Sequence, residues 1–248
     1  MNEFYQILLL FAVGSVTGII NVIAGGGSSL SLPVLIFLGL DPSTANGTNR
    51  VGILTQSISA VKSFKDENHF ELMQSLKISL LTLPGAILGA IAAVKIDDAL
   101  FQKILGFVLI LVALSMVFPK INITDSVSSE KLDWKITIAM LFVGFYGGFI
   151  QVGVGFVIMA ALHYLMKLTL VKVNMHKVFV TLVFTIPALI IFIVASKINW
   201  FLGLSLATGN AFGGWWAAKL TVKKGDKLIK FVLVLVVIFM ALKLLNLF

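Results

Sequence analysis

The chain has 248 residues, of which 59% are apolar and 12% are charged, and it contains no cysteine. A soluble domain of this length carries about a quarter charged residues, so this composition excludes a soluble globular protein and indicates a chain that faces lipid. The formal charge of +8 comes mainly from scattered single Lys and Arg residues. That pattern is typical of membrane-flanking charges, and we expect no nucleic-acid partner.

Seven segments have the length and apolar character of a membrane crossing, which takes about 20 residues in a helix. In chain order they are residues 4–23, 71–94, 98–118, 134–152, 172–196, 200–220 and 226–247. The first is expected to remain in the mature chain, because Glu3 precedes it and no Lys or Arg occurs before Arg50. An eighth segment, 43–64, is long enough but rich in amide and hydroxyl side chains. We expect other helices to enclose it.

Two shorter apolar runs, 28–40 and 156–166, each follow a glycine break, at 24–27 and 153–155. Helices interrupted at matching places in two halves of a chain are typical of transporters. The backbone N–H groups at the start of the following helix favour an anion. The breaks therefore predict a binding site, although glycines at such spacing also serve helix packing alone.

The sequence is duplicated. Gly18 to Asn21 followed by Gly25 matches Gly148 to Gln151 followed by Gly155 at an offset of 130, and residues 85–89 match 209–213 at an offset of 124. We expect an N-terminal repeat of membrane helices at 1–118, a polar linker at 119–133 and a C-terminal repeat at 134–248.

The orientation of the halves depends on the short runs. If these runs cross, each half has five segments and the halves are inverted; if they are re-entrant, each half has four and the halves are parallel. The basic residues divide more unevenly between the two sides in the first arrangement, as the positive-inside rule requires. We therefore predict an all-α polytopic membrane protein with broken helices, as a 5+5 inverted repeat, with 4+4 as the alternative.

The predicted substrate-binding residues fall at the breaks and at the polar helix entrances that follow the short runs. At the breaks they are Asn21, Gly26, Gly27, Ser28, Gln151, Gly153 and Gly155. At the entrances they are Asn46, Asn49, Arg50, Asn174 and Lys177. Two intramembrane cations with few acidic neighbours describe a cavity for a small anion. In the alternative interpretation Arg50 snorkels to the interface or pairs with carbonyls at a helix C-terminus.

His176 precedes Lys177 and is either a proton carrier or a hydrogen-bonded packing residue. No catalytic or nucleotide-binding motif occurs, so we expect no enzyme, no cofactor and no metal site.

Residues 18–28, Pro33, 45–49 and 144–155 resemble the TauE/SafE family of bacterial sulfite and organosulfonate exporters. The resemblance covers essentially the whole chain. It implies a multi-pass protein of the bacterial inner membrane that carries small sulfur-containing or carboxylate anions. The chain departs from a strict repeat, because Lys177 replaces Arg50, and His163 and His176 have no counterpart in the first half.

We therefore expect a secondary transporter that moves a small anion by alternating access. An ion gradient, with H+ considered as the coupling ion, would drive it in the absence of an ATPase motif. The expected partners are the lipid bilayer and the anion, and a homodimer is also considered. The alternatives are an uncoupled anion channel, which the same basic residues would line, and a membrane scaffold whose glycines serve assembly alone.

Overall fold

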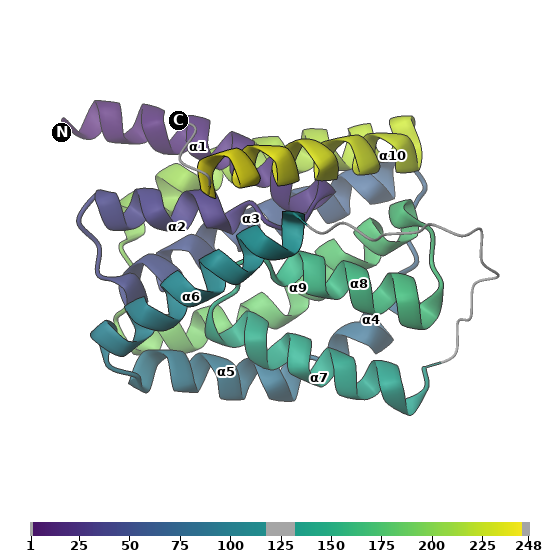
Figure 1. Cartoon of the computed structure of the whole chain (residues 1–248), viewed down its shortest axis with the longest axis horizontal. Coiled ribbons are helices and arrows are strands. Elements are labelled where there is room, and N and C mark those ends of the chain that lie inside the picture. The colour runs from purple at the N-terminus through teal and green to yellow at the C-terminus, as the bar shows by residue number, and fades with distance from the viewer. Residues whose placement is uncertain (1, 118–131, 245–248) are drawn as a thin grey trace.

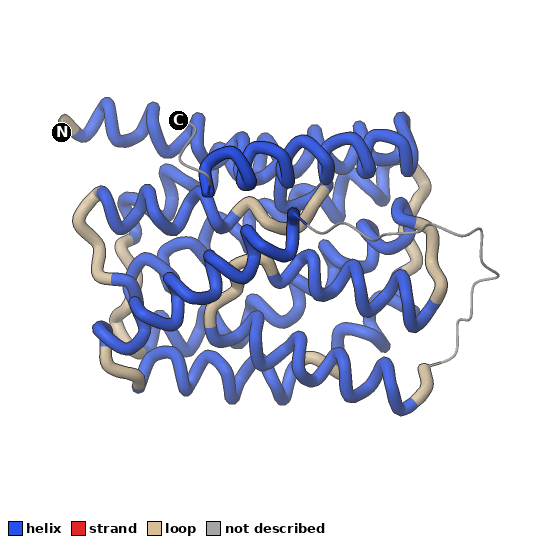
Figure 2. The backbone as a smooth tube through the Cα atoms, in the orientation of Figure 1, coloured by secondary structure: helices blue, strands red, loops and turns tan. Residues whose placement is uncertain are grey.

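The structure is a computed structural model that describes residues 2–117 and 132–244, and the helices within these ranges pack into one bundle (Figures 1 and 2). The helices of the first half are α1 (Glu3–Ile23), α2 (Ser28–Phe37), α3 (Pro42–Asp66), α4 (Leu72–Leu80), α5 (Leu83–Lys95) and α6 (Asp98–Val117). Those of the second half are α7 (Trp134–Phe149), α8 (Val154–Met166), α9 (Leu170–Val194) and α10 (Trp200–Leu244). The described residues contain no strand. Most of the predicted linker lies outside them.

Polar caps begin several helices at the predicted places. Asn2 accepts a hydrogen bond from the Phe4 amide at the start of α1, Asp41 from Thr44 at the start of α3, and Asp133 from Ile136 at the start of α7. Each cap satisfies a backbone N–H that has no partner inside the helix.

One of the predicted crossings differs in the structure, and another prediction is confirmed at Gly225. Residues 71–94 form two helices, α4 and α5, at an angle of 49°, because Pro84 in the first turn of α5 cannot donate the backbone hydrogen bond that would continue α4. Residues 200–220 and 226–247 were predicted as separate helices, and this is confirmed: the range of α10 contains two helices, which Gly225 divides. Gly225 has φ 64° and ψ −160°, a conformation that is essentially restricted to glycine.

The two short helices turn back on the helices that precede them (Figure 1). α2 runs antiparallel to α1 and α8 runs antiparallel to α7, so each half contains a helical hairpin whose tip is a glycine break. The tips lie inside the bundle and not at its ends, as the tan segments between the helices show in Figure 2. Gly25 and Gly155 are so close that a Cβ on either would lie within 3.0 Å of the other's backbone.

The helix contacts of one half recur in the other. α1 packs on α10, and α7 packs on α5. Glycines make both contacts close: a Cβ on Gly14 would lie within 3.0 Å of Leu206, and one on Gly144 within 3.0 Å of Thr82. These partners are related by the same offsets of 130 and 124 residues that the sequence shows. The two hairpins are therefore held by equivalent contacts.

The polar helix α3 is enclosed, as its composition predicted. Asn46, Asn49 and Arg50 are each 0% exposed. Three hydroxyls one turn apart on α3 donate to three carbonyls one turn apart on α10 (Thr55 to Ala207, Ser59 to Ala211, Ser63 to Trp215). This stripe therefore joins α3 to α10, which satisfies polar groups that lipid could not.

By length and apolar character, α1 and α9 can each cross a membrane, and α4 together with α5 makes a third candidate span. α2 and α8, with 10 and 13 residues, rise only about 15–20 Å at 1.5 Å per residue, less than the hydrocarbon thickness of about 30 Å.

Ion pairs between the halves lie at both ends of the bundle. At one end, on the left of Figure 1, Lys197 lies 3.5 Å from Asp41 and 3.4 Å from Asp98; we call this the Asp41 end. At the other, Lys172 lies 2.7 Å from Glu71; we call this the Glu71 end.

Candidate functional site

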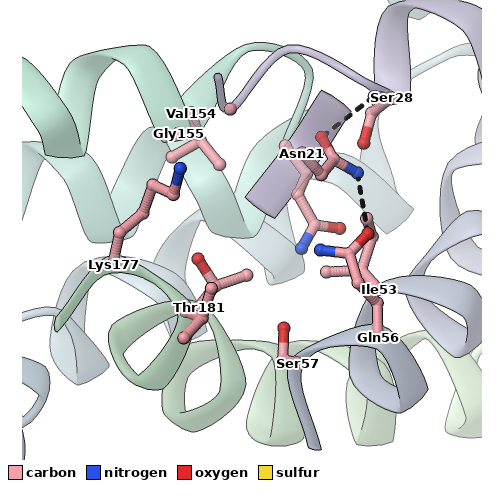
Figure 3. A pocket seen from close by; sticks show the side chains of 12 residues that line it. Asn21, Ser28, Ile53, Gln56, Ser57, Val154, Gly155, Lys177 and Thr181 are labelled. Atoms are coloured by element: carbon pink, nitrogen blue, oxygen red, sulfur yellow. Dashed lines mark hydrogen bonds between the residues drawn. The ribbon is translucent and has the colours of Figure 1, made fainter. Parts of the chain in front are cut away.

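A small internal pocket lies where the two hairpin tips meet (Figure 3). The first half lines it with Asn21, Gly25, Ser28, Ile53, Gln56 and Ser57. The second half lines it with Gln151, Val154, Gly155, Lys177, Val178 and Thr181. Its free volume is about 20 Å³, which is space for about one water molecule.

The first break is organised by Asn21, near the end of α1. Its Oδ1 accepts a hydrogen bond from the backbone N–H of Ser28 at 3.3 Å, and its Nδ2 donates to Oε1 of Gln56 at 3.1 Å. Asn21 thus caps α2 across the break, because Gly27 at the N-cap position has no side chain to do so. Gly26 accepts a hydrogen bond from the Ser29 hydroxyl. Gly26 and Gly27 do not line the pocket.

The second break is built differently. Gln151 has φ 61° and Gly153, at the N-cap of α8, has φ 70°, so two left-handed residues on either side of Val152 separate α7 from α8. Nε2 of Gln151 donates to the Thr185 hydroxyl at 3.0 Å, while Oε1 is buried without a hydrogen-bond partner among the described residues. Gln151 and Gly155 line the pocket, whereas Gly153 only shapes the turn.

Lys177 is the cation of the pocket. Its side chain is 2% exposed, and Figure 3 shows the Nζ atom pointing towards Gly155 at the start of α8. Nζ donates to the Val22 carbonyl and to Oδ1 of Asn174, both at 2.7 Å, and lies 3.6 Å from the Met159 sulfur. Asn174 in turn donates to the Ile23 carbonyl at 3.1 Å. α9 therefore binds the C-terminal end of α1.

Arg50 makes the reciprocal contact but stands outside the pocket lining. Its guanidinium donates to the Gly147 carbonyl at 3.1 Å and to the Gly148 carbonyl at 2.5 Å, and it lies 4.7 Å from the centre of the Phe192 ring. Asn46 donates to the Phe149 carbonyl at 2.8 Å. α3 thus binds the C-terminal end of α7, where the last helical carbonyls lack partners and cations are favoured.

Asn49 lies next to the pocket and forms hydrogen bonds with Ser28 and Ser31. Its Oδ1 accepts from the Ser31 hydroxyl at 2.7 Å and its Nδ2 donates to Oγ of Ser28 at 3.3 Å. Asn49 therefore fixes the Ser28 side chain, which does line the pocket, without reaching the pocket itself.

His176 faces away from the pocket lining, towards α4. Its Nδ1 lies 2.9 Å from the Ser75 hydroxyl and its Nε2 lies 3.6 Å from Oε2 of Glu71. The ring is fully buried, with Glu71 and Lys172 next to it at the Glu71 end.

The structure thus brings five predicted residues into one pocket, namely Asn21, Ser28, Gln151, Gly155 and Lys177. The others lie at the breaks, against Ser28 for Asn49, or beside α4 for His176. Asn46, Arg50 and Asn174 lie in the contacts of α3 with the end of α7 and of α9 with the end of α1, which we call the two latches. Gln56, Ser57 and Thr181 line the pocket without having been chosen as site residues. Their sequence signal was helical spacing: Gln56 and Ser57 lie one turn after Ile53 on α3, and Thr181 lies one turn after Lys177 on α9.

No group of three or more His, Cys, Asp or Glu residues that could hold a metal occurs in the described ranges.

A family profile described as "Sulfite exporter TauE/SafE" matches residues 10–244, which is nearly the whole chain. This protein belongs to the TauE/SafE family. A "Probable membrane transporter protein ORF9" of Sinorhizobium is 30% identical over 244 residues, 98% of this chain and 93% of the relative. A "Probable membrane transporter protein" of Haemophilus influenzae is 29% identical, over 95% of this chain and 92% of the relative.

YfcA of Escherichia coli, also a "Probable membrane transporter protein", is 30% identical over 96% of this chain and 88% of its own length. No solved structure matches the chain. Like these TauE/SafE relatives, the protein is a membrane transporter and not an enzyme.

Proposed function

We propose that this protein is a secondary transporter that carries a small anion through the Lys177 pocket by alternating access. The observation that carries the proposal is the composition of the lining: one buried cation with hydroxyl and amide groups, and no carboxylate among the lining residues. A buried ammonium without a carboxylate partner favours an anion as its counter-ion.

The position of the pocket supports alternating access. It lies between the tips of two hairpins, one from each half, and its free volume of about 20 Å³ is too small for an anion of four or five heavy atoms. Binding of such an anion therefore requires the hairpin tips to separate. A pocket that must widen to take its ligand fits a transporter better than a channel, which needs a continuous pore.

We propose further that the halves form a 5+5 inverted repeat across the bacterial inner membrane. With α4 and α5 counted as one bent segment and α10 as two helices divided at Gly225, each half has five segments that alternate in direction, and α1 and α7 start from opposite ends of the bundle (Figure 1). Basic residues gather at the Glu71 end, near helix ends or between helices, and include Lys62, Lys65, Lys167, Lys223 and Lys224. By the positive-inside rule that end faces the cytoplasm.

We take the substrate to be sulfite, an organosulfonate or a related small anion. This class follows from family membership and from the chemistry of the pocket, where the Lys177 ammonium and the hydroxyls of Ser57 and Thr181 can donate to anionic oxygens.

The test is uptake of sulfite and methanesulfonate by proteoliposomes that contain the purified protein. Uptake should saturate with concentration, and Lys177→Gln should lower its rate at least tenfold. Lys103→Gln removes an exposed lysine of α6 and should leave uptake unchanged. Uptake by Lys177→Gln equal to that of the parent protein would refute the assignment. A non-saturating current proportional to voltage would show instead that the protein is an anion channel.

A further inference from the structure

The charges around the pocket set a limit on the charge of its ligand. Lys177 is the one charged side chain among the lining residues. Arg50, the other buried cation of the interior, is engaged by the Gly147 and Gly148 carbonyls and by the face of Phe192. The described residues place no carboxylate in ion-pair contact with either cation.

The helix ends at the pocket add little net charge. α2 and α8 begin there, and each N-terminus contributes about half a positive elementary charge. α1 and α7 end there, and each C-terminus contributes about half a negative charge. The two contributions oppose one another, so the charge that remains at the pocket is mainly that of Lys177.

The hydrogen-bonding groups of the pocket are also few. Two of the Lys177 donors are directed to the Val22 carbonyl and Asn174. Oγ of Ser57 is fully buried and has no hydrogen-bond partner among the described residues, and Figure 3 shows it below the space that Lys177 and Asn21 flank. The Thr181 hydroxyl points into the same space. This set can serve one compact anionic group.

From these features we infer that the pocket selects anions with a single negative charge and rejects dianions of the same size. The inference rests on the proposed function, which it narrows to monoanions such as hydrogensulfite and monosulfonates. A dianion in this pocket would bring one charge without a counter-charge into a buried site, which is costly.

The first experiment compares methanesulfonate with sulfate, which have similar size and sulfur–oxygen geometry but differ by one charge. Isothermal titration of the purified protein at constant ionic strength should give a dissociation constant for methanesulfonate at least tenfold lower than that for sulfate. Sulfite supplies an internal test, because it changes from monoanion to dianion as the pH rises. As the pH rises through this change, the affinity of the protein for sulfite should fall relative to its affinity for methanesulfonate, which keeps one negative charge throughout.

The second experiment adds a cation to the lining. Thr181→Lys should improve the affinity for sulfate relative to methanesulfonate by at least tenfold. Thr137→Lys adds the same charge to an exposed position on α7 and should leave the ratio unchanged. If Thr181→Lys does not fold, the titrations of the parent protein with methanesulfonate, sulfate and sulfite test the monoanion inference on their own.

The outcomes separate the two proposals. Sulfate binding as tight as that of methanesulfonate would overturn the monoanion inference and leave an anion transporter in place. Failure of every probe to bind, or binding that Lys177→Gln does not weaken, would overturn the proposed function itself.

Discussion

Gly25 and Gly155 lie backbone to backbone, so the breaks of the two hairpins form a single contact at the centre of the bundle. Neither residue has room for a side chain, and Gly25 also has φ 98°, which favours glycine. The separation of the tips that substrate entry requires must therefore part these two residues.

Gly155→Ala should destabilise the conformation in which the hairpin tips touch. The added Cβ would overlap the Gly25 backbone, which cannot move aside as a flexible side chain could. We expect a lower melting temperature and a loss of transport. Gly106→Ala is the control, because a Cβ there meets nothing within 4 Å. Equal melting temperatures for the two variants would show that the tips do not touch.

Gly85→Ala and Gly209→Ala should cause losses of similar size, because they disturb equivalent contacts in the two halves. A Cβ at Gly85 would meet the Leu141 carbonyl, and one at Gly209 would meet the Phe11 carbonyl, each within 3.0 Å. The measurement is the melting temperature of both variants in the same detergent. A large effect of one and none of the other would contradict equivalent packing of the halves.

Arg50→Met should lower stability more than it lowers anion affinity. The substitution leaves the Gly147 and Gly148 carbonyls without their charged donor, which we expect to cost about 2 kcal/mol or more. Because Arg50 stands outside the lining, the affinity of the folded protein for methanesulfonate should change less than threefold. Loss of binding at an unchanged melting temperature would instead assign Arg50 to direct substrate contact.

The pH dependence of stability should carry a contribution from Asp41. Burial raises the pKa of this carboxyl, but hydrogen bonds from Thr44 and the nearby Lys197 ammonium outweigh burial, so its pKa lies below the usual 3.8. The ionised form therefore stabilises the fold above pH 3.8, and this contribution disappears as the pH falls through the lower folded-state pKa.

Asp41→Asn keeps a capping oxygen but removes the charge. The difference in melting temperature between the parent protein and this variant should be steady near neutral pH and shrink at pH values below 3.8. Asp66→Asn is the matched control, because it removes a carboxylate at the exposed end of α3 that makes no ion pair among the described residues. If the difference in melting temperature between the parent protein and Asp41→Asn stays the same at the lowest pH, the charge of Asp41 does not contribute to stability as proposed.

The absence of cysteine from the sequence makes the proposed topology directly testable. Lys223→Cys, in the second half at the Glu71 end, should react with a membrane-impermeant maleimide only after the cytoplasmic side is opened. Lys95→Cys, near the Asp41 end, should react in intact cells with a permeable outer membrane. Both positions are exposed. Labelling of both from the same side would contradict the inverted arrangement.

The sequence predicted most helix positions and both glycine breaks, because apolar length and glycine punctuation are local signals. It also predicted that the polar helix α3 is enclosed. The bend between α4 and α5 could have been inferred from Pro84, which lies inside a predicted crossing. The division of α10 at Gly225 was predicted, because the basic stretch around this glycine separates two apolar segments.

The site was harder to predict than the fold. Arg50 and Lys177 looked equivalent in sequence, yet one faces the carbonyls of α7 and the other the pocket. Their difference depends on the rotation of α3 and α9 about their axes, which neither length nor composition determines. Ser57 and Thr181 gave no signal apart from their helical spacing.

The two latches also constrain how the protein is made. The carbonyls at the end of α1 receive donors from Asn174 and Lys177, which lie 151 and 155 residues further along the chain. Until translation reaches α9, the first hairpin must wait in the insertion machinery or in lipid with these carbonyls unsatisfied. The hairpin of each half receives these hydrogen bonds from the other half. The early segments must therefore stay accessible until the later segments have been synthesised.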